Sequence, residues 1–254
     1  MRQRRFALSG LLLVASGLTT AGFSWAQIDP SDRPNVDGVF TGRTCVDTTS
    51  EVCPELSREG VVELLTARAM ALVDAFDELA APKYDCGPAT LPGLFGDPYA
   101  FRVEQHSDRV TFTYEKDDIV RTVWLDGHEH VPPGAGSFFV HGYSTGRYQG
   151  EQLVVETTKF TFDPAGIAGD FMSAPSSTQK RLVERYTRHG DSLRMNLTVE
   201  DPIFLLKPIS YVMKWRPSDD ELSLPWDCQP EAARRNLRLV PTKYPQDPPV
   251  DRRN

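Results

Sequence analysis

Two charged residues on otherwise apolar strand faces carry the clearest chemical signal in the sequence. Arg121 alternates with Val123 and Leu125, and Glu184 alternates with Leu182. Alternate residues of a β-strand point to the same face of the sheet. We therefore predict that Arg121 and Glu184 both point into an apolar interior. An ionised group there costs several kcal/mol unless it is paired or bound, so the two form either a structural ion pair or the polar end of a pocket.

The pocket alternative would support acid/base chemistry. Burial raises the pKa of a carboxyl group, and an adjacent cation lowers that of a phenol, so either can approach neutral pH. The candidate catalytic residues are Tyr114, Arg121, His141 and Glu184. The candidate ligand-binding residues are Arg121, Trp124, Tyr143, Tyr186, Tyr211 and Trp215. Since the sequence has no nucleotide or phosphate motif, we expect no cofactor, and the enzyme would be a lyase, isomerase or cyclase.

A second motif, Gly142-Tyr143-Ser144-Thr145-Gly146, formally matches the nucleophile elbow of serine hydrolases. That elbow joins a strand to a helix, with an acid and a histidine later in the chain. Here a turn and another strand follow, and the single downstream histidine, His189, lies in a predicted hairpin turn. We therefore interpret the glycines as hairpin residues.

A third motif, His128-Glu129-His130, could place two imidazoles on a metal. It lies between Asp126-Gly127 and Pro132-Pro133-Gly134, which indicates a loop. A third ligand such as Glu129, His141 or Asp163 is not identified by any spacing. We predict no metal site.

The elements that position these residues are mainly β-strands. Alternating or β-prone runs predict eight of them, at residues 101–105, 109–115, 119–125, 137–143, 153–160, 180–188, 192–200 and 209–215. Short links join several of these runs. The pattern predicts an antiparallel up-and-down barrel of the lipocalin or calycin kind, because closure removes exposed edges.

A single amphipathic helix is predicted before the strands. Ser57 can cap a helix that runs to about Leu79, in which Val61, Leu65 and Ala69 begin one apolar stripe. Residues 27–54 are polar with Gly and Pro, which indicates an extended arm. Residues 55–230 form one domain, and residues 231–254 a flexible tail.

The N-terminus has the features of an export signal. Basic residues precede Leu11-Leu12-Leu13-Val14-Ala15, and Ser24-Trp25-Ala26 offers small residues for cleavage after Ala26. We predict that residues 1–26 are a signal peptide and that the protein is periplasmic or secreted. No second apolar run is long enough to cross a membrane, and a net charge of -7 argues against nucleic acid as a partner. The sequence does not indicate an oligomeric state.

Export changes how the four cysteines are interpreted, because an oxidising compartment favours disulfides. Cys45 and Cys53 enclose a short polar loop. Pairing them leaves Cys86 to join Cys228, which would tie the start of the domain to its end.

Three stretches resemble a family of secreted bacterial proteins of unknown function. They are Arg121-Thr122-Val123-Trp124-Leu125-Asp126-Gly127 with His130-Val131-Pro132, residues 142–158 from Gly142 to Thr158, and Val183-Glu184-Arg185-Tyr186-Thr187. Members of that family typically read R-x-[IV]-[WY]-[LM]-D-G and then [GD]-x-S-x-G-x-W-E-G-D-T-L-V-V-[DE]-T. Tyr148, Gln149 and Gln152 depart from the usual Trp, Glu and Asp. The resemblance implies the compartment and the architecture but no reaction.

Three functions follow from these features. The first is an exported barrel that binds an apolar or aromatic small molecule in its interior. The second is the cofactor-free enzyme described above, using the same pocket. The third is a filled barrel that acts as an interaction module of the cell envelope.

Overall fold

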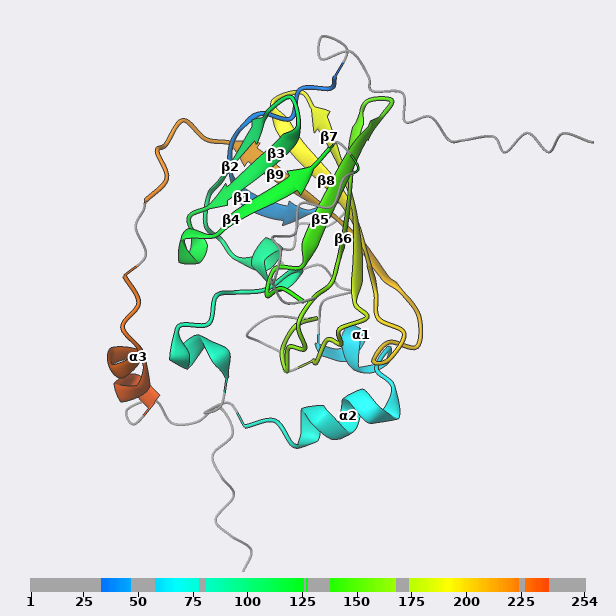
Figure 1. The fold of residues 1–254 in the computed structure, drawn as a ribbon, viewed down its shortest axis with the longest axis vertical. Coiled ribbons are helices and arrows are strands. Elements are labelled where there is room, and N and C mark those ends of the chain that lie inside the picture. The colour runs from blue at the N-terminus through cyan, green and yellow to red at the C-terminus, as the bar shows by residue number, and fades with distance from the viewer. Residues whose placement is uncertain are drawn as a thin grey trace, which may run out of the picture.

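The computed structural model describes residues 33–46, 58–77, 81–125, 127, 138–167, 174–223 and 227–237. Within them the fold is mainly β, and the strands close into one barrel (Figure 1). Its strands are β1 (Gly38–Cys45), β2 (Phe101–Gln105), β3 (Arg109–Tyr114), β4 (Val120–Trp124), β5 (Tyr143–Gln149), β6 (Gln152–Thr158), β7 (Arg181–His189), β8 (Ser192–Glu200) and β9 (Ile209–Pro217). They follow one another around the barrel in chain order, and β1 pairs with β9 to close it. The predicted signal peptide, residues 1–26, lies outside the described residues.

The period-2 pattern of the sequence builds this barrel. On β3, Val110, Phe112 and Tyr114 are at most 4% exposed, while the residues between them are half-buried. β8 alternates in the same way along its whole length. Tight turns join several strands, and Gly150 and Gly190 adopt the positive φ that the β5–β6 and β7–β8 turns need. The predicted barrel and the predicted hairpin turn at His189 are confirmed.

The prediction of a purely antiparallel sheet is wrong at one place. β4 and β5 pair in parallel, with Val123 opposite Ser144 and Trp124 opposite Thr145. Parallel neighbours need a long connection, and residues 125–142 supply one. The prediction of a strand at 137–143 is wrong: the strand begins only at Tyr143, and within the described residues 138–142 Phe139 makes only an isolated bridge to Phe160.

The barrel also has nine strands in place of the predicted eight. The additional strand is β1, which lies in the predicted extended arm. Its alternation is weak, since Phe40 and Cys45 are its fully buried residues. Gly42 has a φ of +62°, and the register with β9 shifts between Thr41 and Thr44. In such an irregular strand, buried and exposed residues do not alternate every two positions, so the sequence pattern does not predict it.

The predicted continuous helix from Ser57 to Leu79 is wrong, because the structure divides it. The two pieces are α1 (Arg58–Val62) and α2 (Ala67–Asp74). Between them Leu65 forms a bridge with Leu205, and the Leu206 N–H donates to the Leu64 carbonyl at 2.8 Å. Thr66 then caps α2 by accepting from the Ala69 N–H at 3.3 Å. Both helices lie beneath one end of the barrel (Figure 1).

Short elements and a disulfide complete the described fold. They are the 3₁₀ turns η4 (Pro82–Asp85), η5 (Gly93–Gly96) and η6 (Lys116–Asp118), and the helix α3 (Pro230–Leu237). The predicted Cys86–Cys228 disulfide is present and holds α3 beside η4, where Arg234 pairs with Asp85. Cys45 is also disulfide-bonded, while Cys53, its predicted partner, lies outside the described residues. The predicted tail, 231–254, begins within α3.

Candidate functional site

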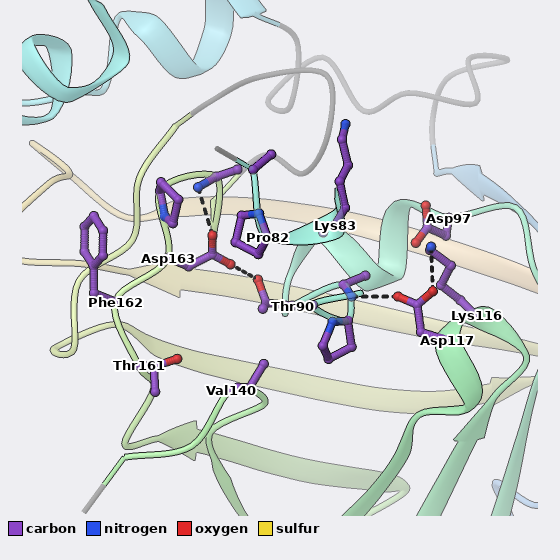
Figure 2. A pocket seen from close by; sticks show the side chains of 17 residues that line it. Pro82, Lys83, Thr90, Asp97, Lys116, Asp117, Val140, Thr161, Phe162 and Asp163 are labelled. Carbon is purple, nitrogen blue, oxygen red and sulfur yellow. Dashed lines mark hydrogen bonds and ion pairs between the residues drawn. The ribbon is translucent and has the colours of Figure 1, made fainter. Parts of the chain in front are cut away.

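A cavity of about 360 Å³ opens at the end of the barrel, and we call it the end cavity. Its size falls within the range of about 300–1,000 Å³ found for small-molecule sites. Two chain segments without regular strands, around residues 81–93 and 161–165, form two walls, and Asp97, Val140 and η6 complete the lining (Figure 2). The lining residues are Ala81, Pro82, Lys83, Gly87, Pro88, Ala89, Thr90, Gly93, Asp97, Lys116, Asp117, Val140, Thr161, Phe162, Asp163, Pro164 and Ala165.

Asp163 connects the two walls of the end cavity. One of its carboxylate oxygens accepts a hydrogen bond from the Thr90 hydroxyl, and the other accepts from the Ala165 N–H at 2.9 Å (Figure 2). The Asp163 backbone also pairs with Ser176 through two hydrogen bonds. The side chain is therefore held in one place while part of it faces the cavity.

Asp117 fixes the other side of the cavity to the barrel. It lies in η6, the turn between β3 and β4, where its φ is +58°. Its carboxylate accepts from the Ala89 N–H at 2.7 Å and from Lys116 Nζ at 2.8 Å. The Asp117 side chain is only 2% exposed. This contact joins the wall formed by residues 81–93 to the end of the sheet.

Lys180 connects the two walls through hydrogen bonds to backbone carbonyl groups. Its Nζ donates to the Leu91 carbonyl at 2.6 Å and to the Gly166 carbonyl at 3.1 Å, and it lies 4.3 Å from the centroid of the Phe160 ring. The side chain is fully buried and makes no ion pair within the described part of the chain. Burial lowers the pKa of the Lys180 amine to about 8, although Asp163 and Asp201 act in the opposite direction.

The end cavity does not follow from the sequence. There Lys180 is only the first residue of a predicted strand, and Asp163 only one of several possible metal ligands. A signal is present in Phe162-Asp163-Pro164-Ala165-Gly166. An Asp before a Pro and a Gly is typical of a turn in which the carboxylate caps a backbone N–H two residues later, as Asp163 and Ala165 do here.

Arg121 and Glu184 lie elsewhere, in the barrel interior, and they form an ion pair. Arg121 Nη1 donates to Glu184 Oε2 at 2.8 Å, and Nη2 donates to Oε1 at 2.7 Å. This two-pronged geometry is the strongest that a guanidinium and a carboxylate can adopt. Both residues point inward, as predicted from their strand faces, and they are 4% and 0% exposed.

Neighbouring hydroxyl groups complete the hydrogen bonding of this pair. Arg121 Nε donates to the Ser144 hydroxyl at 3.0 Å, and Nη2 donates to the Thr157 hydroxyl at 2.6 Å. The Tyr186 hydroxyl donates to Glu184 Oε2 at 2.7 Å. Burial lowers the pKa of Arg121 but Glu184 raises it more, so the net change is upward. We call these five residues, Arg121, Ser144, Thr157, Glu184 and Tyr186, the interior cluster.

The serine of the Gly142–Gly146 motif is therefore part of the barrel framework. Ser144 lies within β5, is 3% exposed and accepts from Arg121. Strands stand on both sides of it in the chain, with no helix directly after it. A serine followed by a turn and another strand is the arrangement expected from the sequence, whereas in a hydrolase elbow a helix follows the serine.

The other predicted site residues divide between the interior and the outside. Tyr114, Tyr186, Tyr211 and Trp215 are buried inside the barrel. Burial raises the pKa of Tyr114, against the opposing effect of Arg121, and burial together with Glu184 raises that of Tyr186. Trp124 and Tyr143 are half-buried and alternate with inward residues, so they lie on the outer side.

His141 is half-buried near the end of the barrel, directly after Val140 of the cavity lining. Burial, Arg121 and Lys180 lower the pKa of its imidazole to about 4, against an opposing effect of Asp117. The His128–His130 motif lies outside the described residues. Among the residues that are described, no group of three metal-ligating side chains occurs.

No protein-family model matches the chain, and no curated protein matches it. The resemblance to a secreted bacterial family therefore stays a prediction. Among solved structures, the wild-type fluorescent protein UnaG is similar at 14% identity, over 61% of this chain and 93% of that one, with a TM-score of 0.31. A mutant of UnaG is similar at 13% identity, over 62% and 94%, with a TM-score of 0.28. At such TM-scores the likeness carries no argument about function. No described helix is both long and apolar enough to span a membrane.

Proposed function

We propose that this chain is an exported barrel protein that binds an apolar or aromatic small molecule in the end cavity. The observation that carries the proposal is the end cavity itself, which combines a sufficient volume with mostly apolar walls and a few fixed polar groups. Val140 and Phe162, which line it, are 43% and 51% exposed. Exposed apolar side chains that line a hollow gain free energy when a ligand covers them.

The arrangement favours binding at the end of the barrel over binding to the interior cluster. Arg121 and Glu184 bind each other, and neither lines the end cavity. In the end cavity, by contrast, Asp163 and Thr90 hold each other at the surface of the hollow (Figure 2). A ligand with an apolar body and a hydrogen-bond donor would fit these surroundings, since a carboxylate oxygen can accept more than one bond.

Export is supported by the N-terminal sequence and by the Cys86–Cys228 disulfide, because stable disulfides belong to oxidising compartments. Intact-mass measurement of protein from its native host tests this part. We expect a chain that begins at Gln27 and gains four hydrogens on reduction. A chain that retains residues 1–26 or contains free thiols would contradict it.

The binding proposal is tested with N-phenyl-1-naphthylamine, a neutral aromatic probe whose fluorescence rises in apolar sites. Val140→Trp places a large ring in the lining of the end cavity. The matched control is Val120→Trp, because Val120 is 61% exposed on β4 and does not line the cavity. We expect Val140→Trp to weaken probe binding about tenfold or more and Val120→Trp to change it less than about twofold. Equal effects of the two variants would overturn the proposal.

A further inference from the structure

A second hollow lies next to the end cavity, and we call it the side groove. Its volume is about 590 Å³, and it lies along α2, the turn at 177–179 and residues 203–204. The lining residues are Arg68, Ala71, Leu72, Phe162, Ser177, Thr178, Gln179, Ile203 and Phe204. Phe162 lines both the side groove and the end cavity, and no other described residue is common to the two linings. The two hollows are therefore neighbours that share this residue.

As the shared lining residue, Phe162 is placed to act as a partition between the hollows. Its side chain is 51% exposed, and it contacts Phe204 edge-on with the ring centroids 6.3 Å apart. Figure 2 shows its ring standing apart from the Asp163–Thr90 pair. An exposed aromatic ring can change rotamer on a short timescale. A ligand longer than the end cavity could thus continue past Phe162 into the groove.

The side groove differs from the end cavity in charge. Among the described residues, the end cavity is lined by more aspartates than lysines, whereas the lining of the side groove contains no acidic residue and one cation, Arg68. The Arg68 guanidinium lies 5.9 Å from the centroid of the Phe204 ring. Its side chain makes no hydrogen bond or ion pair with the rest of the described chain, apart from that ring contact. A cation above an apolar floor of Leu72, Ile203 and Phe204 suits a carboxylate attached to an apolar body.

We infer that the end cavity and the side groove form one elongated site for an amphipathic carboxylate. Its apolar body would occupy the end cavity, and its carboxylate would reach Arg68 by passing Phe162. This inference rests on the binding function proposed for the end cavity, and it names the class of ligand. The excess of aspartates disfavours the reverse orientation, because it would repel the anionic end from the cavity.

The experiment compares cis-parinaric acid, a fluorescent long-chain carboxylate, with its methyl ester. Arg68→Met removes the cation and keeps most of the apolar stem. We expect this variant to weaken binding of the acid about tenfold, which corresponds to one charge-assisted contact, and to change binding of the ester less than about twofold. Arg216→Met, on the exposed outer side of β9, is the matched control and should leave both affinities unchanged.

The remaining variants separate this inference from the proposed function. Val140→Trp should weaken the acid as well as N-phenyl-1-naphthylamine, since both use the end cavity. If Arg68→Met weakens the acid while Val140→Trp does not, the groove binds alone and the single-site inference is wrong. If Val140→Trp weakens the naphthylamine probe but Arg68→Met affects acid and ester equally, the function stands and the carboxylate assignment fails. A normal melting temperature of Arg68→Met would show that any loss is not misfolding.

Discussion

Glu184 in the barrel interior and Asp163 in the end cavity are both carboxylates that bind a hydroxyl group, yet their surroundings are opposite. Glu184 is fully buried and faces a guanidinium at two positions and the Tyr186 hydroxyl. Asp163 is half-buried, binds Thr90 and a backbone N–H, and interacts with a buried cation, Lys180, whose amine is bound to carbonyl groups. The partners of the Glu184 carboxylate all belong to the protein itself, whereas the Asp163 carboxylate lines a cavity in which a ligand could also bind it.

This difference separates a charge that holds the fold from a charge that a ligand can reach. A buried ion pair contributes little compared with an apolar pair, but breaking it leaves an unpaired charge at a large cost. A half-exposed carboxylate keeps contact with water, so losing its charge costs less. Stability should therefore respond to changes in the interior cluster, and ligand affinity to changes in the end cavity.

The largest effect is expected for Arg121→Met. It leaves Glu184 buried without its cation, so we expect a loss of about 3–5 kcal/mol in the free energy of unfolding. Urea unfolding followed by fluorescence measures it. The double variant Arg121→Met with Glu184→Leu removes both charges and should lose less than the single variant. A normal stability of Arg121→Met combined with lost probe binding would show that the interior cluster is a ligand site.

A smaller effect is expected when the same chemical change is made in both regions. Glu184→Gln places an amide N–H₂ against the Arg121 or Tyr186 donors, and we expect a loss of about 2–3 kcal/mol. Asp163→Asn can still accept from Ala165 and can donate to Thr90, so we expect a loss below about 1 kcal/mol. Thermal and urea unfolding of both variants under one condition give the comparison. Equal losses would remove the distinction between the two carboxylates.

The sequence predicted the interior better than the end cavity, for a physical reason. Side chains on a strand point alternately to its two faces. The apolar residues two positions away from Arg121 and Glu184 were therefore enough to predict that both point inside. The walls around residues 81–93 and 161–165 follow no period. They are held by contacts between distant residues, such as Thr90 with Asp163 and Lys180 with Leu91, and a single sequence does not reveal such pairs.

The same limit explains the divided helix and the additional strand. The apolar stripe of Val61, Leu65 and Ala69 is real, since all three are buried. The helix is nevertheless interrupted because the backbone near Leu65 pairs with Leu205, far along the chain. β1 carries too few apolar residues to show an alternation, and it is a strand because β2 and β9 pair with its two edges.

Lys180 offers a pH-dependent test of how the cavity walls are held. Its pKa is about 8 in the folded protein and about 10.4 in an unfolded chain. Between these values the unfolded chain binds more protons, so the contribution of Lys180 to stability rises with pH. We expect the difference in unfolding free energy between wild type and Lys180→Met to increase by about 2 kcal/mol from pH 7.5 to 9.5.

Taking the difference removes the contributions of groups that both proteins share, including the tyrosines whose pKa values burial raises. Asp163, Asp201 and His141 are the titratable groups that interact with Lys180, so the difference measures Lys180 together with its effect on these three groups. A difference that stays constant from pH 7.5 to 9.5 would mean that Lys180 keeps its charge inside the fold.

The smallest effect is expected at His141, on the acid side. Its pKa is about 4 in the folded protein and about 6.5 in an unfolded chain. The folded state therefore resists protonation, and the stability associated with neutral His141 is lost as the pH falls from about 6.5 towards 4. Because the side chain is partly exposed, we expect His141→Asn to reduce this loss of unfolding free energy by only about 1 kcal/mol.

Urea unfolding at pH 6.5 and at pH 4.5 measures this change for each protein, with His189→Asn, on the exposed β7–β8 turn, as the matched control. Arg121 and Lys180 both lower the pKa of His141, so replacing Lys180 by Met should reduce the effect of His141→Asn. The stability that His141→Asn retains at pH 4.5 should therefore be smaller when it is compared with Lys180→Met than when it is compared with wild type. If His141→Asn has the same effect on stability with and without Lys180, then Lys180 does not contribute to the loss of stability in acid.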